Sequence, residues 1–131
     1  MAHDEQQRLT ASDVLQRFKD DDLPAFAEMA LTDVNQVGIF GERPLDVAAV
    51  RGIEAEVVAL LEGGAEVNAA GEHGHTALHQ AAAQGHLAVV NILLAAGAKQ
   101  DLRNDWGATA LDLAKSKKHW QIAEALEAAA R

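Results

Sequence analysis

The chain has 131 residues, of which 49% are hydrophobic, 24% charged and only 4% aromatic, and it contains no cysteine. This composition is typical of one globular domain, and it excludes disulfides, thiolate metal sites and wholesale disorder. The net charge is −9, with 14 acidic and 5 basic residues up to Glu66 but 6 of each after it. Such an acidic first half repels phosphate backbones and anionic lipids, so no nucleic-acid or membrane partner is expected.

No segment has the features of a secretory leader or a membrane span. The first eight residues are polar and charged with no apolar segment behind them, unlike a leader peptide. The longest apolar run, Leu87 to Ala96, is interrupted by Asn91 and falls short of the about 20 residues that a span needs. We expect a soluble, cytoplasmic protein that is a monomer on its own, with residues 1–9 as a flexible N-terminus.

Residues recur along the chain at a spacing of 33. The matching sets are Leu45, Leu78 and Leu111; Gly41, Gly74 and Gly107; and Ala48, Ala81 and Ala114. A fixed period of about 20 to 50 residues indicates a solenoid, whose repeats bury their apolar faces against their neighbours. The spacing divides a single domain, residues 10–131, into segments 10–37, 38–70, 71–103 and 104–131.

The first segment, residues 10–37, is the most divergent. Thr10 and Asp13 have the spacing of a helix capping box, and one helical face behind them is apolar, formed by Val14, Leu15 and Phe18. Pro24 is predicted at the start of a second helix, where proline is tolerated. Residues 33–35 lie one period before the equivalent residues 66–68, so the segment is expected to be a degenerate N-terminal capping repeat.

The second segment, residues 38–70, breaks the pattern at two positions. Glu54 and Glu56 stand where the next repeat has Leu87 and Val89. The remaining apolar stripe consists of Ile53, Val57, Leu60 and Leu61. Because glutamates are rarely buried without a partner, we expect the second helix of this repeat to be rotated or shifted.

The third segment, residues 71–103, is the most regular, and the fourth is a C-terminal variant of it. Thr76 is a natural N-cap for a first helix, Gly85 interrupts it, and residues 87–96 form a second helix. In residues 104–131 Lys118 replaces the interrupting glycine, and apolar cover comes from Trp120, Ile122 and Leu126. We expect this last segment to be a degenerate capping repeat.

These motifs resemble the ankyrin repeat family over about residues 38 to 131. The family's Thr-Pro-Leu-His signature is matched by Thr76-Ala77-Leu78-His79, its Gly-His break by Gly85-His86, and its ending by Leu93-Leu94 followed by Gly97-Ala98. The resemblance implies an all-α ankyrin-repeat solenoid of about four helix-turn-helix repeats with degenerate terminal caps. It also implies that the two signature histidines, His79 and His86, hydrogen-bond neighbouring loop backbone, and that a concave face of finger-like turns and inner helices binds another protein.

The period identifies the candidate partner-binding residues directly. Ring-bearing side chains recur one repeat apart at the finger position, and their neighbours form parallel rows. The ring positions are Phe40, His73 and Trp106, and the neighbours are Ile39, Glu72 and Asp105, with Glu42 and His75 on the other side. Aromatic anchors dominate interface energetics. The alternative is that Phe40 and Trp106 fold back over adjacent loops as local hydrophobic plugs.

Four of the six histidines fall in one repeat, which raises a second hypothesis. His73, His75 and His79 suggest a metal- or ligand-responsive module, although a zinc site needs three or four ligands with outer-shell support. No nucleophile elbow, phosphate-binding glycine loop or metalloprotease motif is present, so no enzyme, cofactor or bound metal is expected. We expect a partner-binding protein, with a basic patch on the partner; an inhibitor or immunity-type protein and a non-catalytic scaffold subunit are further alternatives.

Overall fold

The computed structural model describes residues 8–26 and 31–131, and within these ranges the regular structure is entirely helical. The elements in chain order are α2 (Ala11–Asp20), η1 (Pro24–Phe26), α3 (Pro44–Arg51), α4 (Glu54–Glu62), η2 (Glu72–Gly74), α5 (Ala77–Gln84), α6 (Leu87–Ala95), α7 (Ala110–Ser116) and α8 (Trp120–Ala129). Here α denotes an α-helix and η a short 3-10 helix.

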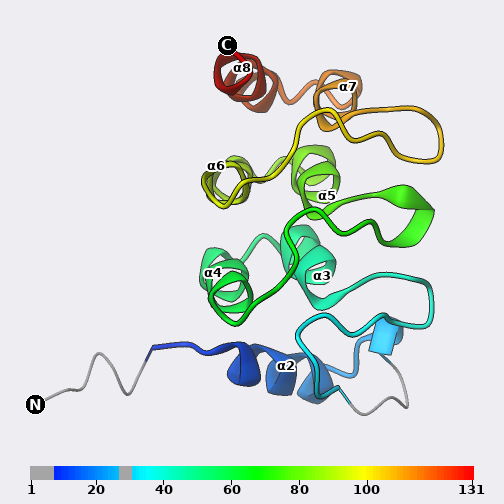
Figure 1. The fold of residues 1–131 in the computed structure, drawn as a ribbon, viewed down its shortest axis with the longest axis vertical. Coiled ribbons are helices and arrows are strands. Elements are labelled where there is room, and N and C mark those ends of the chain that lie inside the picture. The colour runs from blue at the N-terminus through cyan, green and yellow to red at the C-terminus, as the bar shows by residue number, and fades with distance from the viewer. Residues whose placement is uncertain (1–7, 27–30) are drawn as a thin grey trace, which may run out of the picture.

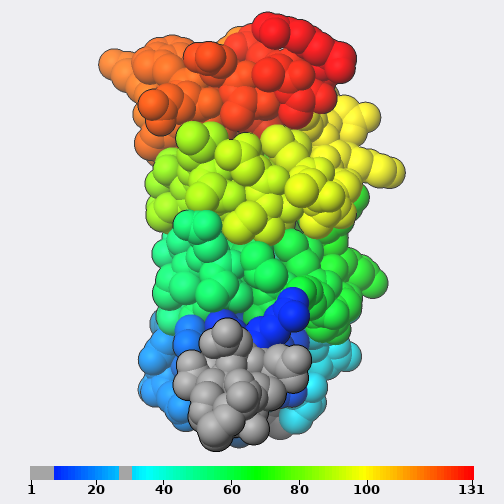
Figure 2. All heavy atoms as spheres, turned by 90° about the vertical axis from the view of Figure 1, so that its left-hand side faces the viewer, coloured from blue at the N-terminus to red at the C-terminus, as the bar shows by residue number. Residues whose placement is uncertain are grey.

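Three helix pairs, α3–α4, α5–α6 and α7–α8, stack in chain order (Figure 1). The inner helices α3, α5 and α7 pack on one another beside the extended loops, and the outer helices α4, α6 and α8 form a second column. Figure 2 shows the layers from the side of the outer helices, each following the previous one along the long axis. The all-α solenoid predicted from the period is therefore confirmed.

Small side chains let the inner helices approach closely. Ala48, Ala81 and Ala114, one period apart, are all completely buried. Each inner helix also has a local reason to begin where it does: Thr76 and Thr109 cap α5 and α7 through their hydroxyl groups, and α3 begins at Pro44. An N-cap side chain satisfies a backbone N–H that the helix leaves free, and proline has no N–H to satisfy.

The Gly-His break joins neighbouring repeats. His86 bonds through Nε2 to the carbonyl oxygen of Val50 at 3.0 Å, and His119, one period later, bonds to that of Ala83 at 3.2 Å. The His86 ring lies against Gly52, which has a φ of 73°, and a β-carbon there would collide with the ring. Only glycine combines that backbone conformation with that clearance.

Asparagines at the repeat ends form a second periodic contact. Asn35 donates to the carbonyl of Gly64 and accepts from the backbone N–H of Glu66. Asn68 makes the same pair of bonds 33 residues later, to Gly97 and Lys99. The prediction that residues 33–35 end a repeat in register with residues 66–68 is thereby confirmed, because Asn35 occupies the same structural position as Asn68.

The N-terminal cap differs from a full helix pair in the residues described. The capping box of Thr10 and Asp13 is confirmed, as is burial of the predicted apolar stripe on α2, formed by Val14, Leu15 and Phe18. Helix α2 lies across the end of the stack and packs on α4 (Figure 1). At Pro24 a three-residue 3-10 turn replaces the expected start of a helix. The predicted continuation of this second helix reaches residues 27–30, which lie outside the described residues. Residues 1–7, which make up most of the predicted flexible N-terminus, also lie outside them.

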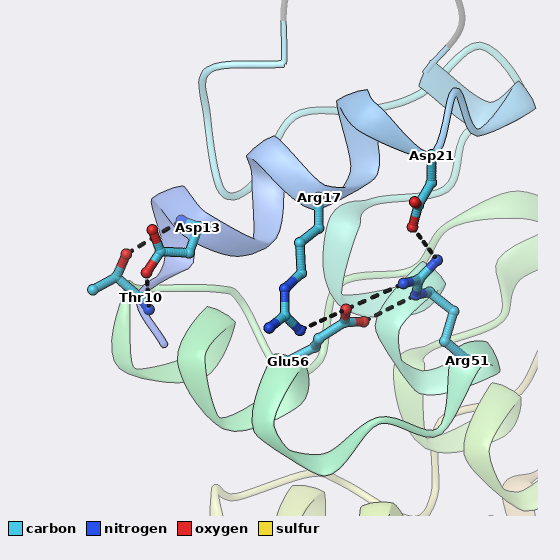
Figure 3. A network of polar contacts seen from close by, with 6 residues as sticks. All are labelled: Thr10, Asp13, Arg17, Asp21, Arg51 and Glu56. Atoms are coloured by element: carbon cyan, nitrogen blue, oxygen red, sulfur yellow. Dashed lines mark hydrogen bonds and ion pairs between the residues drawn. The ribbon is translucent and has the colours of Figure 1, made fainter. Parts of the chain in front are cut away.

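The expected rotation or shift of the second helix in residues 38–70 is wrong. Helix α4 begins and ends 33 residues before α6, in full register. The glutamate at the position of the buried Val89 is itself completely buried, because two guanidinium groups neutralise it (Figure 3). Arg51 donates to both oxygens of Glu56 at 2.9 and 3.2 Å, and Arg17 of α2 approaches at 3.4 Å. Asp21 holds Arg51 from the other side at 3.1 Å.

The C-terminal repeat is also a complete helix pair. Ile122 and Leu126 of α8 are buried, as predicted, whereas Trp120 is 60% exposed. Lys118 takes the left-handed conformation of the glycine that it replaces, with a φ of 62°. The side chain of His119 still makes its bond to the preceding repeat, so the break survives the loss of glycine.

We predict that Glu56→Ala lowers the free energy of unfolding by about 2 to 4 kcal/mol, because it leaves Arg51 with only part of its charge balanced and opens a cavity. Urea denaturation measures this loss. Glu54→Ala, at an exposed position of the same helix, is the matched control and should change stability by less than about 0.5 kcal/mol. Equal effects of the two substitutions would show that the buried ion network does not hold α2 and α4 together.

Candidate functional site

The extended loops beside the inner helices are tight hairpin-like fingers. Each is closed at its base by a backbone bond, from Gly38 to Glu42, from Gly71 to His75 and from Asn104 to Ala108, with donor–acceptor distances of 2.6, 2.8 and 2.9 Å. A turn bond closes each tip, from Gly41, Gly74 and Gly107 to the first residue of its finger. The fingers are therefore equivalent structures one period apart.

The predicted ring positions all lie at the finger tips and are exposed. Phe40 is 56% exposed and Trp106 68%, and His73 is exposed as well. Their row neighbours are on the same tips, with Ile39 55% exposed, Asp105 exposed and Glu72 partly buried. Neither Phe40 nor Trp106 is a buried plug over its loop.

The rings of the second and third fingers touch one another. The His73 and Trp106 ring centroids are 5.1 Å apart, and those of His75 and Trp106 are 5.9 Å apart. A backbone bond of 3.0 Å from Asp105 to the carbonyl of His73 joins the same two fingers. Phe40 makes no ring contact with this group within the described part of the chain. It stands apart on the first finger, whose Ile39 N–H bonds to the carbonyl of Ala25.

Glu42 lies at the base of the first finger, unlike the exposed tip residues with which the sequence grouped it. Its side chain is buried, with 8% exposure, and accepts the backbone N–H of Phe40 at 3.1 Å. Asn104 holds the third finger in a similar way by accepting from Trp106 at 3.0 Å. Glu42 thus positions the tip residue beside it.

A groove of about 310 Å³ lies between the first two fingers and the inner helices α3 and α5. Sequence reasoning missed it, because its walls come from three separate segments. Their residues are Leu23, Ala25, Glu42, Asp46, Val47, Val50, Arg51, Glu72 and Gln80. Asp46 also caps the start of helix α3, where it accepts the N–H of Arg43 at 3.0 Å. The capping pattern carried no signal that this carboxylate also lines a groove.

The carboxylates of this groove have perturbed protonation. Burial raises the pKa of Asp46 from 3.8 to about 7, although the backbone N–H and the charge of Arg43 lower it; the charge of Glu42 adds a smaller upward contribution. Burial also raises the pKa of Glu42, and the neighbouring Glu72 adds to the effect. Water stabilises a carboxylate charge, so a carboxyl group removed from water holds its proton more tightly.

The histidine cluster does not have the geometry of a metal site. Nδ1 of His79 accepts the N–H of Thr76 at 3.1 Å, and Nε2 donates to the carbonyl of Ala108 at 2.9 Å, so both ring nitrogens are occupied. This bond and that of His86 are the backbone contacts implied for the signature histidines. Burial lowers the pKa of both His79 and His75. Among the described residues no group of three His, Cys, Asp or Glu side chains is arranged to hold a metal ion.

Together, the stacked pairs and periodic fingers define a helical repeat protein that presents its exposed rings along one edge. A family model described as "Ankyrin repeats (3 copies)" matches residues 16–104 and 45–130. The chain belongs to the ankyrin repeat family, whose members generally mediate protein–protein interaction and are typically non-catalytic. The search of curated proteins finds no match. In the described parts of the chain, no helix is both long and apolar enough to cross a membrane.

We predict a pH dependence of stability that is specific to Asp46. Between about pH 4 and 7 the folded protein keeps this proton while the unfolded chain loses it, so the free energy of unfolding falls as pH rises through that window. Asp46→Asn keeps the helix-capping acceptor but cannot titrate. Relative to that variant, the wild-type chain should lose a few kcal/mol of stability, at most about 4, between pH 4 and 7 and no more above it.

Urea denaturation of both proteins at each pH gives this difference directly. The comparison removes the opposite contributions of His75 and His79, whose pKa lies below the ordinary value of 6.5, so that the fold gains stability as pH rises toward that value. Parallel stability curves for the two proteins would contradict a raised pKa at Asp46.

Proposed function

We propose that this protein binds a partner protein through its finger face, which we define as Ile39, Phe40, Glu72, His73, Asp105 and Trp106. The observation that carries the proposal is the exposure of Phe40 and Trp106 at equivalent finger tips. We further propose that residues 10–131 act as one domain, that the chain is a cytoplasmic monomer until it meets its partner, and that it catalyses no reaction.

Exposed rings at these tips have no role in the core of the fold. The inner helices are packed by alanine and leucine, and removing the tip rings leaves those contacts intact. Large apolar side chains exposed to water in a rigid setting favour contact with another surface. Trp106 is the strongest anchor, because it is the most exposed and the rings of His73 and His75 hold it from one side.

The charge on this face supports a basic partner. Glu72 and Asp105 flank the rings, Glu42 and Asp46 lie in the groove beside them, and the acidic excess of the whole chain is confined to its first half. Acidic surfaces steer basic partners and make association sensitive to salt. An inhibitor or immunity-type protein that covers a basic enzyme or toxin is one form of this function; a scaffold subunit differs only in what the partner does.

We predict that Phe40→Ala and Trp106→Ala each weaken partner binding by about tenfold or more, because central aromatic anchors contribute most of the binding energy at protein interfaces. The partner is obtained by affinity capture with the wild-type chain from its native host, and dissociation constants are then measured by calorimetry with purified proteins.

Trp120→Ala is the matched control, since Trp120 is 60% exposed but belongs to the outer helix α8. It should leave the dissociation constant unchanged, and circular dichroism should show the same helix content for all three variants. Full affinity of a folded Phe40→Ala, Trp106→Ala double variant would remove the finger face as the binding site.

A further inference from the structure

We propose that the groove between the first two fingers and helices α3 and α5 receives one lysine or arginine side chain of the partner, whose cationic group lies among Glu42, Asp46 and Glu72. This inference rests on the proposed function and deepens it by naming the chemistry that the partner presents. The finger tips would hold the partner's surface, and the groove would select a basic residue on it.

Two buried carboxylates in this groove form no ion pair with a side chain of the described residues. Glu42 is 8% exposed and Asp46 3%. Glu42 accepts the backbone N–H of Phe40, and Asp46 accepts that of Arg43. Throughout the described residues, no lysine, arginine or histidine lies within ion-pair distance of either carboxylate, and the charge of Arg43 acts on Asp46 only from beyond that distance. Burying a carboxylate without an opposite charge in contact with it costs free energy, and the chain tolerates this cost twice in one place.

Another buried carboxylate of the same chain can be compared with Glu42 and Asp46. Glu56, which is completely buried, is neutralised by Arg51 and Arg17, as expected for a carboxylate that belongs to the core. Arg51 also lines the groove, but Glu56 and Asp21 occupy its guanidinium.

The shape and lining of the groove suit a long basic side chain. Leu23, Val47 and Val50 supply an apolar wall, of which Val50 is 41% exposed. Lysine and arginine have apolar stems that pack on such surfaces while their charged ends reach polar groups. The groove volume of about 310 Å³ equals about ten water molecules, which is enough space for one such side chain.

The protonation of the groove agrees with the lack of an ion pair, because at Asp46 the effect of burial outweighs that of the charge of Arg43. Burial raises the pKa of both Glu42 and Asp46, and Glu72 raises that of Glu42 further. A cation placed among these three groups favours their charged forms and so offsets the burial. A neutral or acidic side chain in the same place offers no such compensation.

The test uses acetylated and amidated tripeptides, Gly-Lys-Gly and Gly-Arg-Gly, with Gly-Gln-Gly as the neutral comparison, titrated into the full chain and followed by amide chemical shifts in NMR spectra. The two basic peptides should shift resonances of the groove, including those of Val47, Val50 and Gln80, in a saturable way. The glutamine peptide should leave them in place. Comparing the lysine and arginine peptides shows which cation the groove prefers.

Two double variants separate the groove from general electrostatic attraction. Glu42→Gln with Glu72→Gln removes two charges from the groove and keeps the hydrogen-bond acceptor of Glu42, and it should weaken binding of the basic peptides by about tenfold. Glu54→Gln with Glu66→Gln removes the same charge from exposed positions in the same half of the chain. This control should retain the affinity of the wild-type chain.

The proposal is overturned if both double variants weaken binding equally, if the glutamine peptide binds as well as the basic ones, or if the shifts map away from the groove. The peptide titration does not depend on the ring side chains at the finger tips, so Phe40→Ala and Trp106→Ala should bind the peptides normally. If the tip substitutions abolish partner binding while the tripeptides leave the groove unshifted, only the groove proposal fails. Peptide binding in the groove with no effect of the tips on the partner would instead reject the finger-face proposal alone.

Discussion

The structure depends on hydrogen bonds that run from a side chain in one repeat to the backbone of a neighbouring repeat. A helix pair this short buries only part of its apolar surface by itself, so the hydrophobic effect favours stacking but does not select one register. The bonds of His86 to Val50, His79 to Ala108 and Asn68 to Gly97 do select it. Each joins a side-chain nitrogen of one repeat to a specific carbonyl oxygen of the neighbouring repeat, and the bond forms in one direction only. They force equivalent residues into spatial alignment.

This alignment determines where function is possible. Fingers held in register bring His73 and Trp106 into ring contact and leave Trp106 open to solvent. The same stacking encloses carboxylates, and the chain treats them in two ways. Glu56 is neutralised by arginines from two other helices and contributes to the fold, whereas Glu42 and Asp46 have no such partner. The contrast between them directs attention to the groove as a place where a cation from outside would complete the electrostatics.

The period of 33 residues predicted the repeat units, the family and most of the capping chemistry, because those features are local and recur. Thr76 and the capping box at Thr10 needed only their own neighbours to be recognised. The expected displacement of α4 was wrong because two arginines on other helices, Arg51 and Arg17, neutralise the buried Glu56. Arg17 is 39 positions away, on a helix outside the regular repeats. The groove was missed for the same reason: Leu23, Asp46 and Gln80 meet only in three dimensions. Partner contact by the tip residues stays a prediction.

The central claim is that the finger side of the stack, and not the outer helices, contacts the partner. Site-specific photo-crosslinking tests it most directly, with Trp106 and Trp120 replaced in turn by benzoylphenylalanine, since both positions are exposed but lie on different elements. The chain that carries the probe at position 106 is predicted to form a covalent adduct with the captured partner, and the chain that carries it at position 120 is predicted to form none. An adduct from position 120 without one from position 106 would contradict the account.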